Sequence, residues 1–389
     1  MLGVVALVTA GVLTLTQCGS PSDDDSRSGA SGDRTSAGRH GGGDGGGGDG
    51  DGGRPSSRAP GDETSDGDSG TSDEFDEHGN SGDSDDSDDS EDARNSGGSG
   101  SGSDDDWDRG LPGVRADLVR RITSFTSGFH EDSGYRRPSA DVRRAAASGV
   151  AALVDRRRER AERRLASAHL SVRTVTDSAT GRRYAEVAEV RDRSADAASP
   201  RGWGRVYVDL DSPVRWSVQV PHPVADRDTE RLGAELLRRA RGGVLVVAGA
   251  HRKAGRGDEA DVAHERRSVF HAIVEELAER GLPGIQVHGM ADDSAPDHDV
   301  VASTGRGREA VREGRDLARA LARRGYEVCR SWARSCPLEG RANVQGRDAK
   351  AQESEFLHVE FAPKMRTESR HRRAAVAALA EVTRDWRRH

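Results

Sequence analysis

Hydrophobic and polar residues alternate along two short segments in the middle of the chain. Leu170–Val175 and Tyr184–Val190 place apolar side chains at about every second position, which is the period of a half-buried β-strand. The residues between them, Asp177-Ser-Ala-Thr-Gly181, are of the types that turns favour. The pattern therefore predicts a β-hairpin, and two further strands are expected at Gly204–Leu210 and Val214–Val220.

After residue 220, short apolar runs alternate with longer segments of helical period. Buried strands that alternate with amphipathic helices predict an α/β domain, in which helices flank a mixed, mainly parallel sheet. Strands are expected at Gly243–Ala248, Gly284–His288, Asp299–Ala302, Tyr326–Val328 and Glu355–Phe361, and helices at Thr229–Arg241, His264–Arg280, Arg308–Arg324 and Ser369–Trp386.

The segment that precedes the hairpin, residues 109–168, has a helical pattern. Val142, Ala146, Val150 and Leu153 recur at a spacing close to 3.6 residues. We interpret the segment as an N-terminal helical lead-in without a catalytic role. It would pack beside an α/β domain that comprises residues 169–389.

Residues 19–108 consist almost entirely of Gly, Ser and Asp. They contain 26 acidic and 6 basic residues, a net charge of about −20, whereas the whole chain carries −8. A segment with so few apolar residues and so much charge cannot bury enough surface to offset its chain entropy. We therefore predict a long disordered acidic tether.

The remaining residues carry a net charge of about +12, almost all of it from arginine. A basic domain can indicate nucleic-acid binding. Here the arginines have acidic neighbours, as in Arg156-Arg-Arg-Glu-Arg160, and few aromatic residues lie between them. The charge is therefore interpreted as solvated helix surface, and no nucleic-acid partner is expected.

The first seventeen residues are uncharged and rich in Leu, Val, Ala and Gly. This length suits a signal peptide better than a membrane-spanning helix of about 20 residues. Leu15-Thr-Gln-Cys18 resembles a bacterial lipobox, although no basic residue precedes the apolar run. We expect residues 1–18 to direct export, with lipidation of Cys18 anchoring the protein to the membrane; an ordinary secretory signal is the alternative.

Cys329 and Cys336 are the only other cysteines. Two cysteines seven positions apart can close a local disulfide in an oxidising compartment, whereas a zinc knuckle needs a second pair. We therefore predict a structural disulfide between them.

Ionisable side chains lie at the ends of three predicted strands. His222 follows the first and is itself followed by Asp226 and Glu230, His288 ends the second, and Glu360 lies near the end of the third. Open α/β sheets bind ligands at the carboxyl ends of their strands. Imidazole and carboxylate groups are the usual ligands of a catalytic zinc ion. The sequence therefore predicts a zinc site at this edge of the sheet.

The same residues resemble those of zinc amidohydrolases related to N-formylglutamate amidohydrolase and poly-γ-glutamate hydrolase, between about Val214 and Arg366. The resemblance implies a zinc carboxypeptidase-like fold. It also implies zinc ligation by His222, Asp226 and His288, with Glu360 handling protons. The acidic ligand would lie four residues after His222, so Glu230 is an alternative third ligand, and Asp226 is preferred.

A further group of polar residues follows the strand that ends at Ala248. Arg252 is expected at the rim of the site, where a guanidinium suits a substrate carboxylate. His251, Asp261, His264 and Asn343 are candidates for orienting a zinc ligand or holding the substrate. The remaining histidines near the site, His271, His298 and His358, are interpreted as structural.

The sequence thus predicts an exported zinc hydrolase that cleaves an amide or peptide bond in a carboxylate-bearing substrate. Cell-wall peptides, poly-γ-glutamate and N-acyl amino acids fit this description equally. The alternatives are a tethered, non-catalytic wall-binding domain of the same fold, and a protein whose acidic tract is itself the functional part.

Overall fold

A computed structural model describes residues 113–190 and 201–386, and the strands in these ranges form one ten-stranded sheet. The strand order is β1-β2-β3-β4-β6-β5-β7-β10-β8-β9. β6, β5, β7 and β10 are mutually parallel at its centre, whereas β3, β4 and β8 introduce antiparallel pairs. The sheet is therefore mixed with a parallel centre, as predicted. The strands are β1 (Gly113–Ala116), β2 (Leu170–Asp177), β3 (Arg183–Glu189), β4 (Arg205–Asp209), β5 (Trp216–Val220), β6 (Gly243–Val247), β7 (Gly284–Gly289), β8 (Val300–Ser303), β9 (Val328–Arg330) and β10 (Phe356–Phe361).

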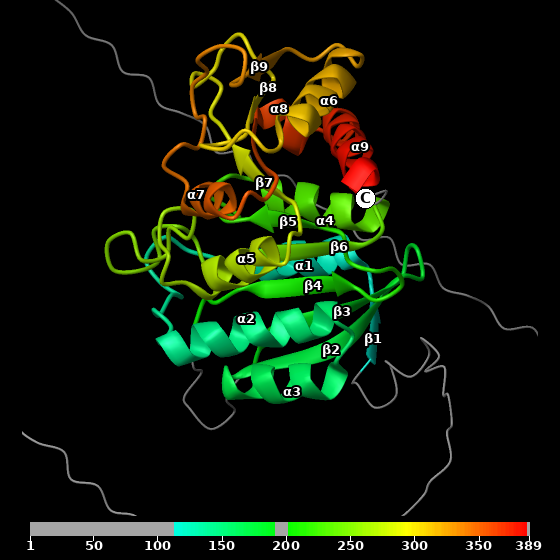
Figure 1. The fold of residues 1–389 in the computed structure, drawn as a ribbon, viewed down its shortest axis with the longest axis vertical. Helices are drawn as coiled ribbons and strands as arrows, with labels where there is room; N and C mark the ends of the chain where they lie inside the picture. Colours follow the sequence, from blue (N-terminus) through cyan, green and yellow to red (C-terminus); the bar gives the residue numbers. More distant parts are fainter. Residues whose placement is uncertain (1–112, 191–200, 387–389) are drawn as a thin grey trace, which may run out of the picture. The chain divides into compact units, whose positions relative to one another are not determined.

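Helices cover both faces of the sheet (Figure 1). On one face, α1, α4, α6 and α9 share an apolar core with Val218 and Val220 of β5. On the other face, α2, α3 and α5 share a second core with Val244 and Val246 of β6. Each large apolar side chain fully buried in these cores contributes about 1.5–3 kcal/mol. The helices are α1 (Leu118–Thr126), α2 (Ala140–Val154), α3 (Arg158–Ser167), α4 (Thr229–Arg239), α5 (Val269–Glu279), α6 (Val311–Ala322), α7 (Val344–Ala351), α8 (Pro363–Thr367) and α9 (Ser369–Trp386).

Two helices near the site begin where a side chain caps them. The α5 helix was expected from His264 but begins at Val269, because the Ser268 hydroxyl accepts a hydrogen bond from the backbone N–H of His271 at 3.0 Å. Residues 261–267 consequently form a loop beside the site. α7 is not among the expected helices, and it begins after Asn343, whose side chain accepts a hydrogen bond from the N–H of Gly346 at 3.0 Å.

Residues 113–168, which lie in the predicted helical lead-in, contribute to the same sheet and core as the predicted α/β domain. β1 lies inside the supposed lead-in and pairs with β2 of the hairpin. Leu118 and Ile122 of α1 are fully buried in the same core as the central strands. Residues 113–168 therefore belong to the same compact unit as the other described residues.

The predicted disulfide joins Cys329 and Cys336, and both residues are buried. Closing a loop of this length removes enough entropy from the unfolded chain to stabilise the fold by about 2–3 kcal/mol. We expect the Cys329→Ala/Cys336→Ala variant to lose that much in urea unfolding. Reductant should destabilise the parent chain and leave the variant unchanged. An equal response of both proteins to reductant would contradict this prediction.

The predicted signal peptide with Cys18, and the acidic tether over residues 19–108, lie outside the described residues. None of the helices described between residues 113 and 386 has both the length and the apolarity needed to cross a bilayer.

Candidate functional site

Three adjacent parallel strands bring the predicted site residues to one edge of the sheet. His222 follows β5, His288 lies near the end of β7, and Glu360 is its register partner on β10. The chain passes from β5 to β6 through α4 on one face and from β6 to β7 through α5 on the other. Because β6 and β7 lie on opposite sides of β5, its carboxyl end is a topological switch point, where α/β sheets open a crevice for ligands.

His222, Asp226 and His288 converge at this edge. One carboxylate oxygen of Asp226, Oδ2, lies 3.2 Å from Nδ1 of His222 and 3.2 Å from Nδ1 of His288. The two imidazole rings are 5.0 Å apart between centroids and meet edge to face. All three side chains are buried, so the group is held in a low-dielectric environment.

The outer nitrogens of both imidazoles are already bonded. Nε2 of His222 lies 2.8 Å from Oδ1 of Asp261, and Nε2 of His288 lies 2.8 Å from Oε1 of Gln286. These oxygens only accept, so each Nε2 carries a hydrogen. A neutral ring then presents the lone pair of Nδ1 to Asp226, whereas a protonated ring donates to Asp226 from Nδ1 as well. A carboxylate that faces two lone pairs requires a cation between them.

The charges of the three groups agree with this requirement. Burial would raise the pKa of Asp226, but its polar contacts with both histidines outweigh burial and hold that pKa well below its usual range. Burial opposes charging of His222, yet its hydrogen bonds to Asp226 and Asp261 raise its pKa. Burial lowers the pKa of His288. Because zinc binds a deprotonated imidazole, a metal at His222 would compete with a proton for Nδ1.

The residues fit zinc. One ligand atom from each of His222, Asp226 and His288 lies within 4.8 Å of the other two. Two imidazole nitrogens and one carboxylate oxygen are a donor set that catalytic zinc sites use, with one position left open.

Glu230, the alternative third ligand, does not join this group. It lies in the first turn of α4, where burial raises its pKa and one carboxylate oxygen has no hydrogen-bond partner. Asp226 is the acidic residue that contacts both imidazoles. Glu230 belongs to none of the potential metal-binding groups found among the described residues.

Glu360 lies close to His288, together with His358, a residue interpreted above as structural. The ring of His358 stacks on that of His288, with 4.4 Å between the ring centroids. Nε2 of His358 lies 3.8 Å from Oε1 of Glu360. Burial, followed by the charge of Asp226, raises the pKa of Glu360 to about 8. The position of His358 two residues before Glu360, on the same face of β10, is the sequence feature that could have placed it in the site.

The loop after residue 338 closes over His358. Gly340 has a φ of +67°, and a Cβ at this position would lie 2.5 Å from Cδ2 of the His358 ring. The close approach of the backbone to the imidazole therefore requires glycine.

Asp261 connects Arg252 and His264 to the cluster. Nη2 of Arg252 donates to Asp261, while its Nη1 lies 3.5 Å from Nδ1 of His222. Nδ1 of His264 lies 3.1 Å from Asp261 on the exposed side. His251 does not reach the cluster: its Nδ1 accepts from the backbone of Lys253, and its Nε2 lies 3.9 Å from Glu131.

We expect Asp261→Ala to weaken zinc binding about 10- to 100-fold, because His222 loses the acceptor that fixes its ring. Competition with a chromophoric chelator measures this affinity. His264→Ala is the matched control, since His264 contacts the same carboxylate without touching His222, and it should change the affinity less than about threefold. Equal losses in both variants would show that the effect does not pass through His222.

The remaining candidates have other contacts. Asn343 is buried; it caps α7 and donates to Gln286, so it lies behind His288 and is not free to hold a substrate carbonyl. His298 pairs with Arg334, and His271 lies in a separate pocket. Arg366, at the end of the resembling region, donates to the backbone carbonyls of Phe361, Arg227 and Met290, and so ties together the chain segments that carry the site.

The chain is similar to several solved hydrolase structures. They include N-formylglutamate amidohydrolase from Ralstonia eutropha JMP134, with 14% identity, a TM-score of 0.31, and coverage of 45% of this chain and 95% of the other. A metallo-carboxypeptidase from Burkholderia cenocepacia has 11% identity, a TM-score of 0.32, and coverage of 47% and 61%. A succinylglutamate desuccinylase from Chromobacterium violaceum has 14% identity, a TM-score of 0.32, and coverage of 52% and 70%. No protein-family model and no curated protein sequence matches the chain.

The group that the sequence resembles, N-formylglutamate amidohydrolase, is thus among the structurally similar proteins. At these identities and TM-scores the similarity assigns no activity. The chemistry of the chain has to follow from its own residues.

Proposed function

We propose that the chain is a zinc-dependent hydrolase that cleaves an amide or peptide bond in a carboxylate-bearing substrate. The main support is the convergence of His222, Asp226 and His288 on one carboxylate oxygen, with the buried carboxyl of Glu360 on the neighbouring strand. A zinc ion held by these three residues would supply Lewis acidity toward the amide carbonyl and lower the pKa of water.

Glu360 transfers the proton in this proposal. Its pKa of about 8 makes it a stronger base than an exposed glutamate, because burial and then the charge of Asp226 disfavour its ionised form. A carboxylate of this basicity can take a proton from the attacking water and return it to the leaving amine.

Arg252 holds the substrate. About a third of its side chain is exposed, and its contact with Asp261 fixes the guanidinium beside His222. A guanidinium carries five N–H donors, so Arg252, held 3.5 Å from Nδ1 of His222, can also bind a substrate carboxylate or the carbonyl oxygen.

The setting of this activity is part of the proposal. The apolar start of the chain and Cys18 support export with a lipid anchor, and the acidic tract over residues 19–108 supports a tether between membrane and enzyme. In that setting, cell-wall peptides, poly-γ-glutamate and N-acyl amino acids are the substrates to test.

The proposal is tested by loading the purified full-length chain with zinc and assaying amine release from a panel of these three substrate classes. We expect hydrolysis of at least one class, loss of turnover with a chelator, and recovery on adding zinc. A zinc-binding chain that hydrolyses none of them would support the non-catalytic binding domain instead. Turnover that resists the chelator would exclude the proposed role of zinc.

A further inference from the structure

A buried network of amide side chains lies behind His288. Gln286 is at its centre: its Nε2 donates to Oε1 of Gln219 at 3.0 Å and to Oε1 of Gln345 at 3.2 Å. Its Oε1 accepts from Nε2 of His288 and from Nδ2 of Asn343. These amide side chains are at most 2% exposed, so water does not compete for their hydrogen bonds.

The backbone carbonyl of Val262 fixes one end of this network. A carbonyl only accepts, and Nε2 of Gln345 donates to it at 2.8 Å. The Oε1 of Gln345 must therefore face the opposite direction, where it accepts from Gln286. This contact in turn requires the Nε2 of Gln286 to face Gln345, and leaves its Oε1 facing His288.

A second backbone group fixes the same orientation independently. The N–H of Gly346 only donates, and Oδ1 of Asn343 accepts from it in the cap of α7. Nδ2 of Asn343 is therefore the atom that faces Gln286, and it requires an acceptor there. Both anchors thus place the Oε1 of Gln286 against Nε2 of His288.

We propose that Gln286, oriented by Gln345 and Asn343, is a positioning residue that selects the tautomer of His288. A neutral ring carries one hydrogen, and Nε2 lies closer to its acceptor, at 2.8 Å from Gln286, than Nδ1 does to Asp226, at 3.2 Å. The hydrogen therefore stays on Nε2, and Nδ1 keeps its lone pair toward Asp226. The ring is then ready to bind zinc without a change of tautomer. This inference rests on the proposed zinc site, and it adds the residues that prepare one ligand for the metal.

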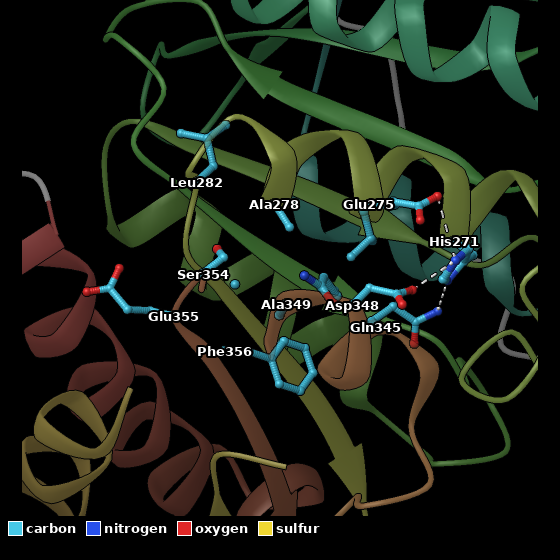
Figure 2. A pocket seen from close by; sticks show the side chains of 13 residues that line it. His271, Glu275, Ala278, Leu282, Gln345, Asp348, Ala349, Ser354, Glu355 and Phe356 are labelled. Carbon is cyan, nitrogen blue, oxygen red and sulfur yellow. Dashed lines mark hydrogen bonds and ion pairs between the residues drawn. The ribbon is translucent and has the colours of Figure 1, made fainter. Parts of the chain in front are cut away.

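At the other end of the network, Gln345 contacts a second histidine, His271, which presents the opposite kind of ring nitrogen to its neighbouring carboxylates. In the pocket of Figure 2, Nε2 of Gln345 lies 3.1 Å from Nδ1 of His271, and Nε2 of His271 lies 3.2 Å from Asp348. A donor at Nδ1 keeps the hydrogen on Nε2, which faces the carboxylates of Asp348 and Glu275. A hydrogen therefore lies between His271 and its acids, whereas His288 presents a lone pair to Asp226.

The test reads the tautomer directly in the full-length, metal-free chain labelled with ¹⁵N-histidine. Long-range ¹H–¹⁵N NMR spectra distinguish the two neutral forms, and a His288→Gln variant assigns the signal. We expect the parent chain to hold the hydrogen of His288 on Nε2. In Gln286→Met, the Nδ1–H form should appear and zinc affinity should fall about 10- to 100-fold. Gln286→Glu, which retains an acceptor, should keep the Nε2–H form.

Gln219→Met is the matched control, because it removes a hydrogen bond of the same network on the side away from His288. It should leave both the tautomer and the zinc affinity unchanged. The proposal is overturned if the parent chain carries the hydrogen on Nδ1, or if the tautomers of Gln286→Met and Gln219→Met agree. If Gln286→Met does not fold, the parent spectrum and that of Gln286→Glu decide. A failure of the zinc site itself would be distinct, since the parent chain would then bind no zinc whatever its tautomer.

Discussion

Glu360→Gln is expected to lower the turnover number about 10²- to 10⁴-fold while the chain keeps its zinc. Gln has nearly the same shape as Glu but cannot take a proton from water, and general acid–base catalysis is worth about this factor. Glu360 is not needed to hold the metal in the proposed site, because His222, Asp226 and His288 supply the ligands. Steady-state kinetics on the best substrate, with zinc content measured on the same samples, would show the separation.

Glu230→Gln is the matched control for this experiment. Glu230 and Glu360 are each 7% exposed, but Glu230 lies outside the cluster. The Glu230→Gln variant should retain its zinc, and its turnover number should stay within a few-fold of that of the parent chain. Equal losses in the two variants would mean that burial of a carboxylate, and not proton transfer at residue 360, accounts for the effect.

The same substitution of Glu360 is expected to stabilise the zinc-free protein at alkaline pH. Burial, and then the charge of Asp226, raises the pKa of Glu360 from 4.5 to about 8. Below about pH 4.5 the carboxyl is protonated in both the folded and the unfolded chain. Between pH 4.5 and 8 only the folded chain keeps the proton, so stability falls as pH rises, by up to about 1.4 kcal/mol per pH unit.

The amide that replaces this carboxyl does not titrate, so the stability difference between the two proteins should grow with pH. We expect Glu360→Gln to match the parent chain near pH 4.5 and to be about 2–4 kcal/mol more stable at pH 8 to 9. Urea unfolding after removal of zinc, at a series of pH values, measures the difference. A difference that does not depend on pH would contradict the raised pKa.

The strands that carry the site could be predicted because each is a short run in which apolar residues recur at every second position. β5, β7 and β10 follow from such runs, and the rule that parallel strands share their carboxyl ends then brings His222, His288 and Glu360 together. Recognising each of these residues as a candidate requires only the strand that carries it or precedes it. Long-range contacts are not required for that step.

Which acidic residue completes the cluster depends on local backbone geometry, and the spacing of the residues in the sequence does not reveal that geometry. Asp226 and Glu230 both follow His222 at helical intervals, so the sequence left both as candidates. In the structure, Val224 and Asp228 adopt positive φ values of 69° and 66°. These turns direct the carboxylate of Asp226 back to the imidazoles, and α4 begins only afterwards.

Residues that act through long-range contacts were beyond reach. Gln286 and Gln345 are 59 positions apart in the sequence, and they meet because α7 packs beside β10 and α5. β1 was missed for a similar reason, since four residues with a half-exposed pattern form a strand only when β2 is available to pair with them. In each case the deciding partner is distant in sequence.

Anomalous scattering at the zinc edge from crystals of the zinc-loaded chain tests the central claim most directly. We expect one zinc peak at about 2.0–2.2 Å from Nδ1 of His222, Nδ1 of His288 and a carboxylate oxygen of Asp226. A peak bound instead by His271 and Asp348, or no peak among His222, Asp226 and His288 at saturating zinc, would contradict it.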